Sequence, residues 1–185
     1  MGVAAKPQLF PQEVRGRRVP MVNLWARLPG ERADEVIVIG THYDTKIMHG
    51  HPDPDHNFKF QGANDGGSGT VVLVELARML KERKRRCTYW FVWFDGEESV
   101  PFHWDDRYAL FGSTWFANQL KAKGDHKKVK AMILLDIIGY PGLRTDDDTL
   151  SDPRLKRIFT EAAARLGLER HFFRGAPTEI KDDHV

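Results

Sequence analysis

A short and almost wholly apolar run, Glu35 to Gly40, is the feature that most constrains the fold of this chain. It reads Glu-Val-Ile-Val-Ile-Gly, so its apolar residues do not alternate with polar ones as they would in a strand with one wet face. A strand of this kind is buried on both faces, as happens when helices cover both sides of a sheet. The sequence therefore predicts an α/β fold with a mixed, mostly parallel β-sheet sandwiched by helices.

The other expected elements alternate in the same way. Strands are expected at Val19–Arg27, Cys87–Phe94 and Val129–Ile138. Helices are expected at about Gly67–Lys84, after the stretch Trp104 to Ser113 and ending near Lys123-Gly124, and from Asp152-Pro153 to about Leu166. Met1 to Pro11 contains no convincing strand or helix, and the residues from His171 onward are expected to be mostly irregular. The chain ends at Asp182-Asp183-His184-Val185 without a terminating element, so we expect residues 1–185 to be one domain that is incomplete at both ends.

Composition excludes several classes of protein. With 41% hydrophobic and 29% charged residues over 185 positions, the chain is globular and long enough for one domain with a sizeable core. The net charge is +2, and the basic clusters at Lys81–Arg86 and around Lys121–Lys130 are read as solvated helix ends, so no nucleic-acid partner is expected. Cys87 is the single cysteine, which excludes an internal disulfide. No apolar run reaches the ~20 residues of a membrane span, and the N-terminus has no signal-peptide core.

Two adjacent carboxylates, Glu97 and Glu98, follow the apolar run Tyr89 to Phe94 and the turn signal Asp95-Gly96. Adjacent residues at a strand end point in different directions, so one carboxylate could bind a metal while the other faces a substrate or a water. Taken alone, such a pair is more often a solvated acidic turn.

Other residues with the same chemistry follow predicted strands or precede helices. His42 and Asp44 come at the end of the strand that contains Glu35–Gly40, two positions apart and therefore on one side. Asp65 stands at a glycine-rich entrance to a helix, where an N-cap is the simpler interpretation. Asp136 lies inside an apolar run, and an ionised carboxylate there is costly unless it is paired or binds a metal.

The loop from Met48 to Asn64 adds His49, His51 and His56. Loop histidines without regular spacing are usually exposed, and we expect no role for these three.

These residues form a constellation, because the carboxyl edge of an open α/β sheet is where ligands bind. Its candidate members are His42, Asp44, Asp65, Glu97, Glu98, Asp136, Asp182, Asp183 and His184. One imidazole with several carboxylates and no cysteine pair fits a catalytic zinc site of one or two ions.

The order of these blocks resembles the glutaminyl-peptide cyclotransferases (glutaminyl cyclases), which share a superfamily with the di-zinc aminopeptidases. The blocks are Thr41-His42-Tyr43-Asp44-Thr45-Lys46, Gly62-Ala63-Asn64-Asp65, Phe94-Asp95-Gly96-Glu97-Glu98, Leu134-Leu135-Asp136-Ile137-Ile138-Gly139 and Asp182-Asp183-His184-Val185. The resemblance runs from about Met21 to the last residue, and it includes Trp104 and Leu110-Phe111-Gly112-Ser113. It implies a zinc-exopeptidase-like fold.

The resemblance also implies a role for each matching residue. Asp65 and Glu98 would be zinc ligands, Glu97 the general acid/base, and Asp136 and Asp182 a hydrogen-bonded acidic pair. Trp104 would line the substrate pocket. The family's last zinc ligand is a histidine further downstream, which His184 does not match, so the chain is expected to be a fragment.

Two chemistries suit these residues. A cyclase with one zinc would convert the N-terminal glutamine of a peptide to pyroglutamate and release ammonia. An aminopeptidase with two zinc ions, the second bound by His42, would hydrolyse N-terminal residues. A catalytically silent binding domain of the same fold is a third reading. The resemblance favours the cyclase, a peptide substrate with a free N-terminus, and an exported (periplasmic or secreted) location. No membrane partner is expected.

Overall fold

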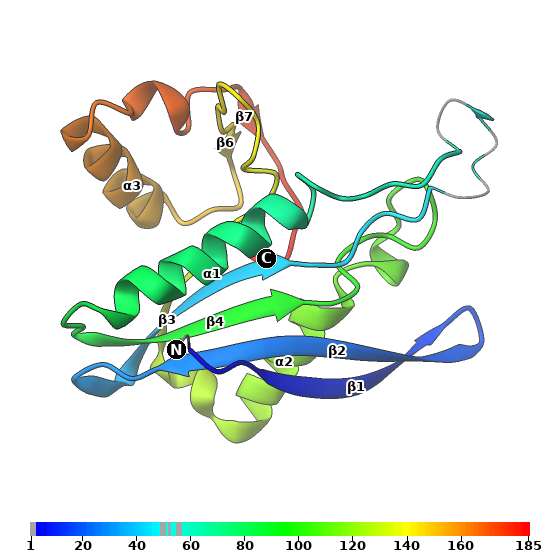
Figure 1. Cartoon of the computed structure of the whole chain (residues 1–185), viewed down its shortest axis with the longest axis horizontal. Coiled ribbons are helices and arrows are strands. Elements are labelled where there is room, and N and C mark those ends of the chain that lie inside the picture. Colours follow the sequence, from blue (N-terminus) through cyan, green and yellow to red (C-terminus); the bar gives the residue numbers. More distant parts are fainter. Residues whose placement is uncertain (1–2, 49–50, 52, 55–56) are drawn as a thin grey trace.

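A five-stranded sheet forms the centre of the computed structural model, which describes residues 3–48, 51, 53–54 and 57–185. Its strands are β1 (Lys6–Val14), β2 (Arg17–Leu28), β3 (Arg32–His42), β4 (Cys87–Phe94) and β5 (Val129–Leu134), in the order β1-β2-β4-β3-β5. β2 is antiparallel to both of its neighbours, whereas β3 is parallel to β4 and to β5. All described strands of this sheet except β2 therefore run in one direction. This confirms the predicted mixed, mostly parallel sheet (Figure 1).

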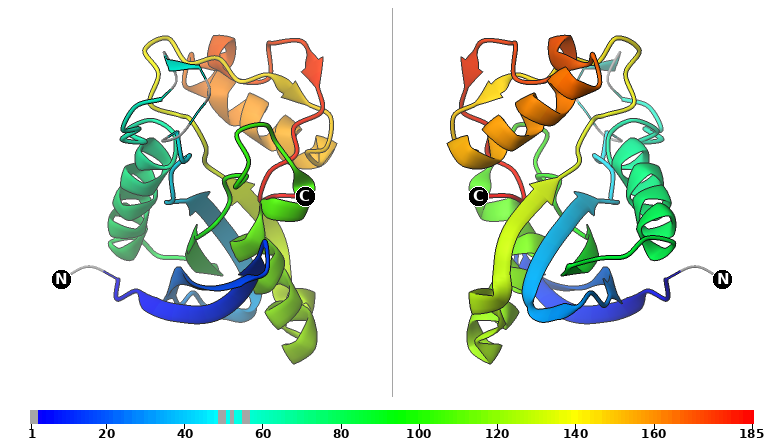
Figure 2. Two further views of the ribbon diagram at one scale, coloured as in Figure 1. Left: turned by 90° about the vertical axis from the view of Figure 1, so that its right-hand side faces the viewer. Right: turned by 90° about the vertical axis from the view of Figure 1, so that its left-hand side faces the viewer.

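Helices α1 (Gly67–Lys81) and α2 (Phe111–Lys123) cover opposite faces of this sheet (Figures 1 and 2). Side chains along β4 alternate between the two faces, as the pleat of a strand requires. Phe91 belongs to the apolar cluster that contains Leu73 of α1, whereas Val92 and Phe94 pack with Phe116 of α2. Burial on both sides explains why the central strands β3 and β4 read as continuous apolar runs.

A smaller lobe stands over the carboxyl ends of the parallel strands (Figure 2). It contains β6 (Asp147–Asp148), α3 (Pro153–Arg165) and β7 (Pro177–Thr178). Within the described residues, short 3₁₀ helices also lie at Asp106–Tyr108, Asp125–Lys128 and Glu169–His171. Asp152 caps α3 by accepting the N–H groups of Arg154 and Leu155, and Gly167 follows the helix with a φ of +68°. The predicted start and stop of this helix are confirmed.

The prediction that Met1 to Pro11 contains no strand is wrong, because β1 begins at Lys6 and pairs with β2 along its whole length. The sequence did not indicate this strand because it contains Pro7 and Pro11, and proline cannot donate a hydrogen bond to a sheet ladder. β1 lies at the edge of the sheet, where one side of the strand needs no partner. A hairpin turn joins the two strands through Arg15 and Gly16, both at positive φ.

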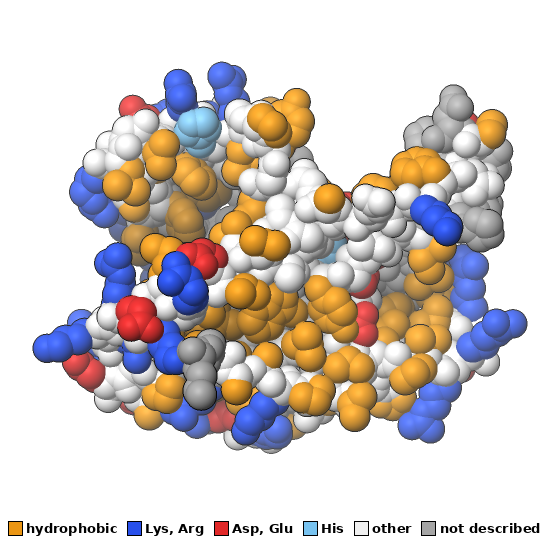
Figure 3. All heavy atoms as spheres, viewed as in Figure 1, with side chains coloured by type: hydrophobic (Ala, Val, Ile, Leu, Met, Phe, Trp, Pro, Cys, Tyr) orange, Lys and Arg blue, Asp and Glu red, His pale blue; other side chains and the backbone are white. Residues whose placement is uncertain are grey.

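Burial is uneven on β5 and α1. The residues of β5 are at most partly covered, because among the described strands it pairs with β3 alone. On α1, Val71 and Val74 are exposed, whereas Leu73 and Ala77 face the sheet. Figure 3 shows hydrophobic side chains across the face of the molecule that carries α1. Within the described residues, no helix is both long and apolar enough to cross a bilayer.

Candidate active site

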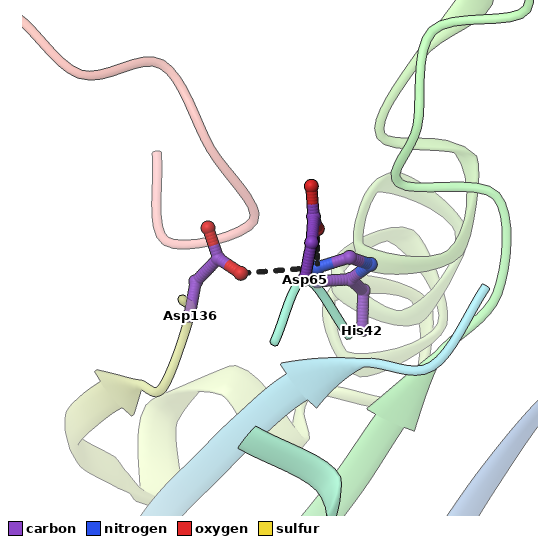
Figure 4. Close-up of side chains that lie close together, drawn as sticks. All are labelled: His42, Asp65 and Asp136. Atoms are coloured by element: carbon purple, nitrogen blue, oxygen red, sulfur yellow. Dashed lines mark hydrogen bonds and ion pairs between the residues drawn. The ribbon is translucent and has the colours of Figure 1, made fainter. Parts of the chain in front are cut away.

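His42 is the centre of the candidate site. It is the last residue of β3 and is 1% exposed. Its Nε2 atom lies 3.0 Å from an Asp136 oxygen and 3.1 Å from an Asp65 oxygen (Figure 4). One ligand atom from each of these three residues lies within 4.8 Å of the others, which is close enough for the three to bind one metal ion.

The local fold explains how the two aspartates reach the histidine. Gly66, with a φ of +81°, is the N-cap of α1 and forms no side-chain cap bond. The N-cap interpretation of Asp65 is therefore wrong, and its carboxylate faces His42 instead. β5 ends at Leu134 rather than at the predicted Ile138, so Asp136 lies just after the strand. Its carboxylate pairs with His42, which offsets the cost of removing a charged group from water.

Asp44 holds the turn that carries the two adjacent glutamates. Its two carboxylate oxygens accept the backbone N–H groups of Glu97 and Glu98, each at 3.2 Å. Glu97 then lies with an oxygen 3.8 Å from Nδ1 of His42, on the opposite side of the ring from Asp65 and Asp136. Glu98 has an oxygen 3.7 Å from Nζ of Lys46, and it lies close enough to Asp65 for that charge to raise its pKa. The pair is therefore not a solvated acidic turn, since Glu97 is 8% exposed.

The C-terminal segment brings two more buried carboxylates to the site. Asp182 and Asp183 are 8% and 5% exposed, and one Asp182 oxygen accepts the N–H of Asp183 at 2.6 Å. Asp136 hydrogen-bonds to His42, and the expected hydrogen bond between Asp136 and Asp182 stays a prediction. Burial, and after it the negative charge of Asp136, raise the pKa of Asp182 to about 6.

The electrostatics of this cluster show a surplus of buried negative charge. Burial and the charge of Asp182 raise the pKa of Glu97 to about 9, and burial with the charge of Asp65 raises the pKa of Glu98 to about 7. Burial lowers the pKa of His42, but its carboxylate partners outweigh burial and raise that pKa. Carboxylates crowded in this way become ionised more readily when a cation lies among them. An imidazole with carboxylate oxygens is a donor set that suits zinc.

Three residues singled out in the sequence lie outside the cluster. The Trp104 side chain is 44% exposed, and its indole N–H donates to Asp106 at 2.6 Å. His184 bonds to Asp148 at 3.0 Å. The His51 ring contacts the Phe102 ring at a tilt of 54°, with ring centroids 3.6 Å apart.

Of the other loop histidines, His49 and His56 lie outside the described residues.

Comparison with known proteins identifies the family to which the chain belongs. The family model described as peptidase family M28 matches residues 23–185. The chain belongs to this family. Its fold is similar to that of a glutaminyl cyclase of known structure from an Acidobacteriales bacterium, with a TM-score of 0.87 and 32% sequence identity. The match covers 98% of this M28 chain and 59% of the other chain.

Curated relatives carry two kinds of name. The M28 chain is 28% identical to a glutaminyl-peptide cyclotransferase of Dictyostelium discoideum, over 82% of this chain and 47% of that protein. It is 31% identical to a "probable zinc metalloprotease" of Leptosphaeria maculans, over 77% of this chain and 30% of the other. The M28 chain thus spans half or less of these curated relatives, which include both named cyclases and named zinc metalloproteases.

Sequence reasoning gave no role to two residues of this site. Lys46 was quoted only as part of a block, although its ammonium contacts Glu98 and donates to the carbonyls of Ser99 and Pro101. Asp183 was among the candidate members but was assigned no role, and it is as buried as its neighbour Asp182, with a pKa that burial raises to about 7. A lysine among polar residues and the second of two aspartates give no signal of burial in the sequence.

Proposed function

We propose that the full-length protein is a zinc-dependent glutaminyl-peptide cyclotransferase that cyclises the N-terminal glutamine of peptides and releases ammonia. The observation that carries this proposal is the placement of a buried carboxylate, Glu97, across the His42 ring from the Asp65–Asp136 side. This arrangement sets an acid/base group beside a metal-binding group. The named cyclases among its relatives support the proposal.

Asp65 and Glu98 are the residues that we assign to zinc, together with a histidine in a part of the full-length protein that this chain does not include. Asp65 belongs to the three-residue cluster, whereas Glu98 lies beside it, and Lys46 neutralises part of its charge. A bound zinc ion would act as a Lewis acid on the γ-amide carbonyl of the substrate glutamine.

Glu97 moves the proton in this proposal. As a carboxylate, it takes a proton from the neutral α-amine of the substrate as the amine nitrogen forms a bond to the γ-amide carbon. The bond between that carbon and the amide nitrogen breaks, and Glu97 delivers the proton to the departing ammonia. Burial of Glu97 keeps bulk water away from this exchange, so the attacking group is the substrate's own amine.

Asp136 and Asp182 orient the site around this exchange. Asp136 fixes the His42 ring through its hydrogen bond at 3.0 Å. Asp182 adds negative charge beside Glu97, which favours the protonated form of Glu97 and so makes Glu97 a stronger base for taking the proton from the substrate amine. Trp104 is half-exposed at the surface and is assigned to the substrate pocket, with a peptide that has a free N-terminus as the ligand. An exported location and a single catalytic domain over residues 1–185 belong to the same proposal.

A di-zinc aminopeptidase is the second candidate, and one observation favours it. Nε2 of His42 lies among the carboxylates of the cluster, where it could bind a second metal ion. Glu97 would then take a proton from an attacking water, and the peptide bond after the N-terminal residue would break. The silent binding domain is the third candidate, and it predicts no turnover with either substrate.

The deciding experiment incubates the full-length protein with a glutaminyl dipeptide and, separately, with an aminoacyl chromogenic amide. Ammonia release from the first alone supports the cyclase. Hydrolysis of the second refutes it in favour of the aminopeptidase, and no reaction with either refutes both enzymes. Metal analysis of the same sample provides a second discriminator, since one zinc per chain is expected for the cyclase and two for the aminopeptidase.

A further inference from the structure

Asp148 of β6 is a buried carboxylate outside the candidate active site that gathers four hydrogen bonds. One oxygen accepts the backbone N–H groups of Leu150 at 3.1 Å and Ile180 at 3.2 Å. The other accepts the Ser151 hydroxyl at 2.6 Å and Nε2 of His184 at 3.0 Å. The residue is 6% exposed, so these bonds are shielded from water. Hydrogen bonds to a charged acceptor are stronger than those between neutral groups.

Two of these donors lie on either side of Asp182 in the sequence. Ile180 is two residues before Asp182, and His184 is two residues after it. The Asp148 carboxylate therefore binds both ends of the segment 180–184. The middle residue of this segment, Asp182, reaches the candidate active site. Asp182 itself is held inside this segment, where its backbone carbonyl accepts the N–H of Val185 at 3.1 Å.

Few other contacts fix this segment to the rest of the lobe. The ladder between β6 and β7 is two residues long, pairing Asp147 with Pro177 and Asp148 with Thr178. It continues by a single bond from Thr149 N–H to the Thr178 carbonyl at 2.9 Å. From β7 the chain runs down towards the sheet (Figures 1 and 2). Asp148 thus lies at the point where the segment leaves the lobe for the site.

We propose that Asp148 is a positioning residue that holds Asp182 against the His42–Asp136 pair by binding Ile180 and His184. Without it, the described polar contacts that still anchor residues 180–184 would be the short β6–β7 ladder and the exposed ion pair between Lys181 and Asp106. The carboxylate of Asp182 would then occupy its buried position for a smaller fraction of the time. This inference rests on the proposed function in one respect, because it takes Asp182 to contribute to catalysis.

Kinetics of four variants of the full-length protein test the positioning role. Asp148→Asn and His184→Phe should each lower kcat at least tenfold with a smaller change in KM. His184→Gln can still donate a hydrogen bond, and it should restore most of the kcat lost in His184→Phe. The matched control is Asp152→Ala, which removes the cap of α3 in the same lobe, should cost about 1 kcal/mol of stability, and touches nothing in residues 180–184.

The double variant Asp148→Asn/His184→Phe tests whether the two residues lower kcat through the same anchor or independently of each other. If both residues act through one anchor, its kcat should be no lower than that of the worse single variant. Fully additive losses would overturn the proposal. So would a kcat loss in Asp152→Ala that equals the loss in Asp148→Asn. If Asp148→Asn fails to fold, the comparison of His184→Gln with His184→Phe decides.

Amide hydrogen exchange gives a readout that needs no activity. Asp148→Asn should speed exchange in residues 179–185 and leave exchange in β3 and α1 unchanged, whereas Asp152→Ala should leave 179–185 as in the wild type. Unchanged exchange in that segment in Asp148→Asn would overturn the inference. If the wild type turns over neither substrate, the proposed function fails, while the exchange result still decides the anchoring role of Asp148.

Discussion

Replacing Glu97 by glutamine should stabilise the metal-free protein. Burial and the charge of Asp182 raise the pKa of Glu97 from 4.5 to about 9. A raised carboxyl pKa means that stability is greatest below pH 4.5 and is lost as the pH rises towards 9. At pH 7 the penalty corresponds to the interval between 4.5 and 7, which is about 3 kcal/mol at 1.36 kcal/mol per pH unit. Glutamine has nearly the same shape and no charge, so Glu97→Gln should recover most of this energy.

The same variant should lose its activity and keep its zinc. Removing a general acid/base lowers kcat by roughly 10²- to 10⁴-fold. The matched variant is Glu98→Gln, at the adjacent position, which should instead weaken zinc binding. Urea unfolding of chelator-treated protein at pH 5, 7 and 8.5 measures the first effect, and ammonia release with metal analysis measures the second.

Three results would refute the reasoning about these two residues. Retained turnover in Glu97→Gln would remove its role as the acid/base. A loss of zinc from Glu97→Gln together with retention in Glu98→Gln would reverse the two assignments. A less stable metal-free Glu97→Gln at pH 7 would show that the carboxylate is not held in an unfavourable position.

Three further substitutions test the packing around the site. Gly69→Ala should destabilise the protein by about 1–3 kcal/mol, because its new Cβ would overlap the Thr41 hydroxyl and lie 2.5 Å from the Leu135 carbonyl oxygen, which urea unfolding would measure. Ile137→Gly should raise the free energy of unfolding by about 1 kcal/mol, because a β-branched residue at a φ of +46° is strained. For Asp148, burial raises the pKa but its hydrogen bonds outweigh burial and lower it from 3.8 to about 2, so stability is present above pH 3.8 and lost as the pH falls through 2. Asp148→Asn should therefore lose about 2 kcal/mol at neutral pH and flatten the acid arm of a stability–pH curve.

Each of these predictions has a result that contradicts it. Val71→Ala, at an exposed position of the same helix, is the control for Gly69→Ala, and equal losses in the two would show that packing against the sheet is not the cause. A less stable Ile137→Gly would mean that the side chain contributes more than its backbone strain costs. An acid arm in Asp148→Asn as steep as that of the wild type would assign the acid loss to other carboxylates.

Much of the framework follows from local sequence. The apolar runs that form β3 and β4 are buried on both faces, and an uninterrupted run of apolar residues indicates such burial. The limits of α3 were also readable, because Asp152 and Gly167 act within a few residues of the helix ends. β1 was missed because its prolines are allowed only by its position at the sheet edge, which depends on pairing and not on local sequence.

The candidate site was predictable as a set of residues but not as a geometry. The strand ends placed His42 and Asp136 at one edge of the sheet, since both follow neighbouring parallel strands. No periodicity, however, indicates that Asp44 uses both its oxygens to hold the Glu97–Glu98 turn. Contacts of this kind join residues more than fifty positions apart, so they depend on the whole fold.

The measurement that tests the central claim most directly is the mass of the product formed from a glutaminyl peptide in heavy-oxygen water. Ammonia release alone does not separate cyclisation from hydrolysis of the side-chain amide, but the origin of the product oxygen does. The account predicts a peptide lighter by one ammonia that carries no heavy oxygen, because the substrate's own amine attacks the γ-amide carbon. A product that contains heavy oxygen, whether a glutamyl peptide or a shortened one, would show that water attacks and would contradict the account.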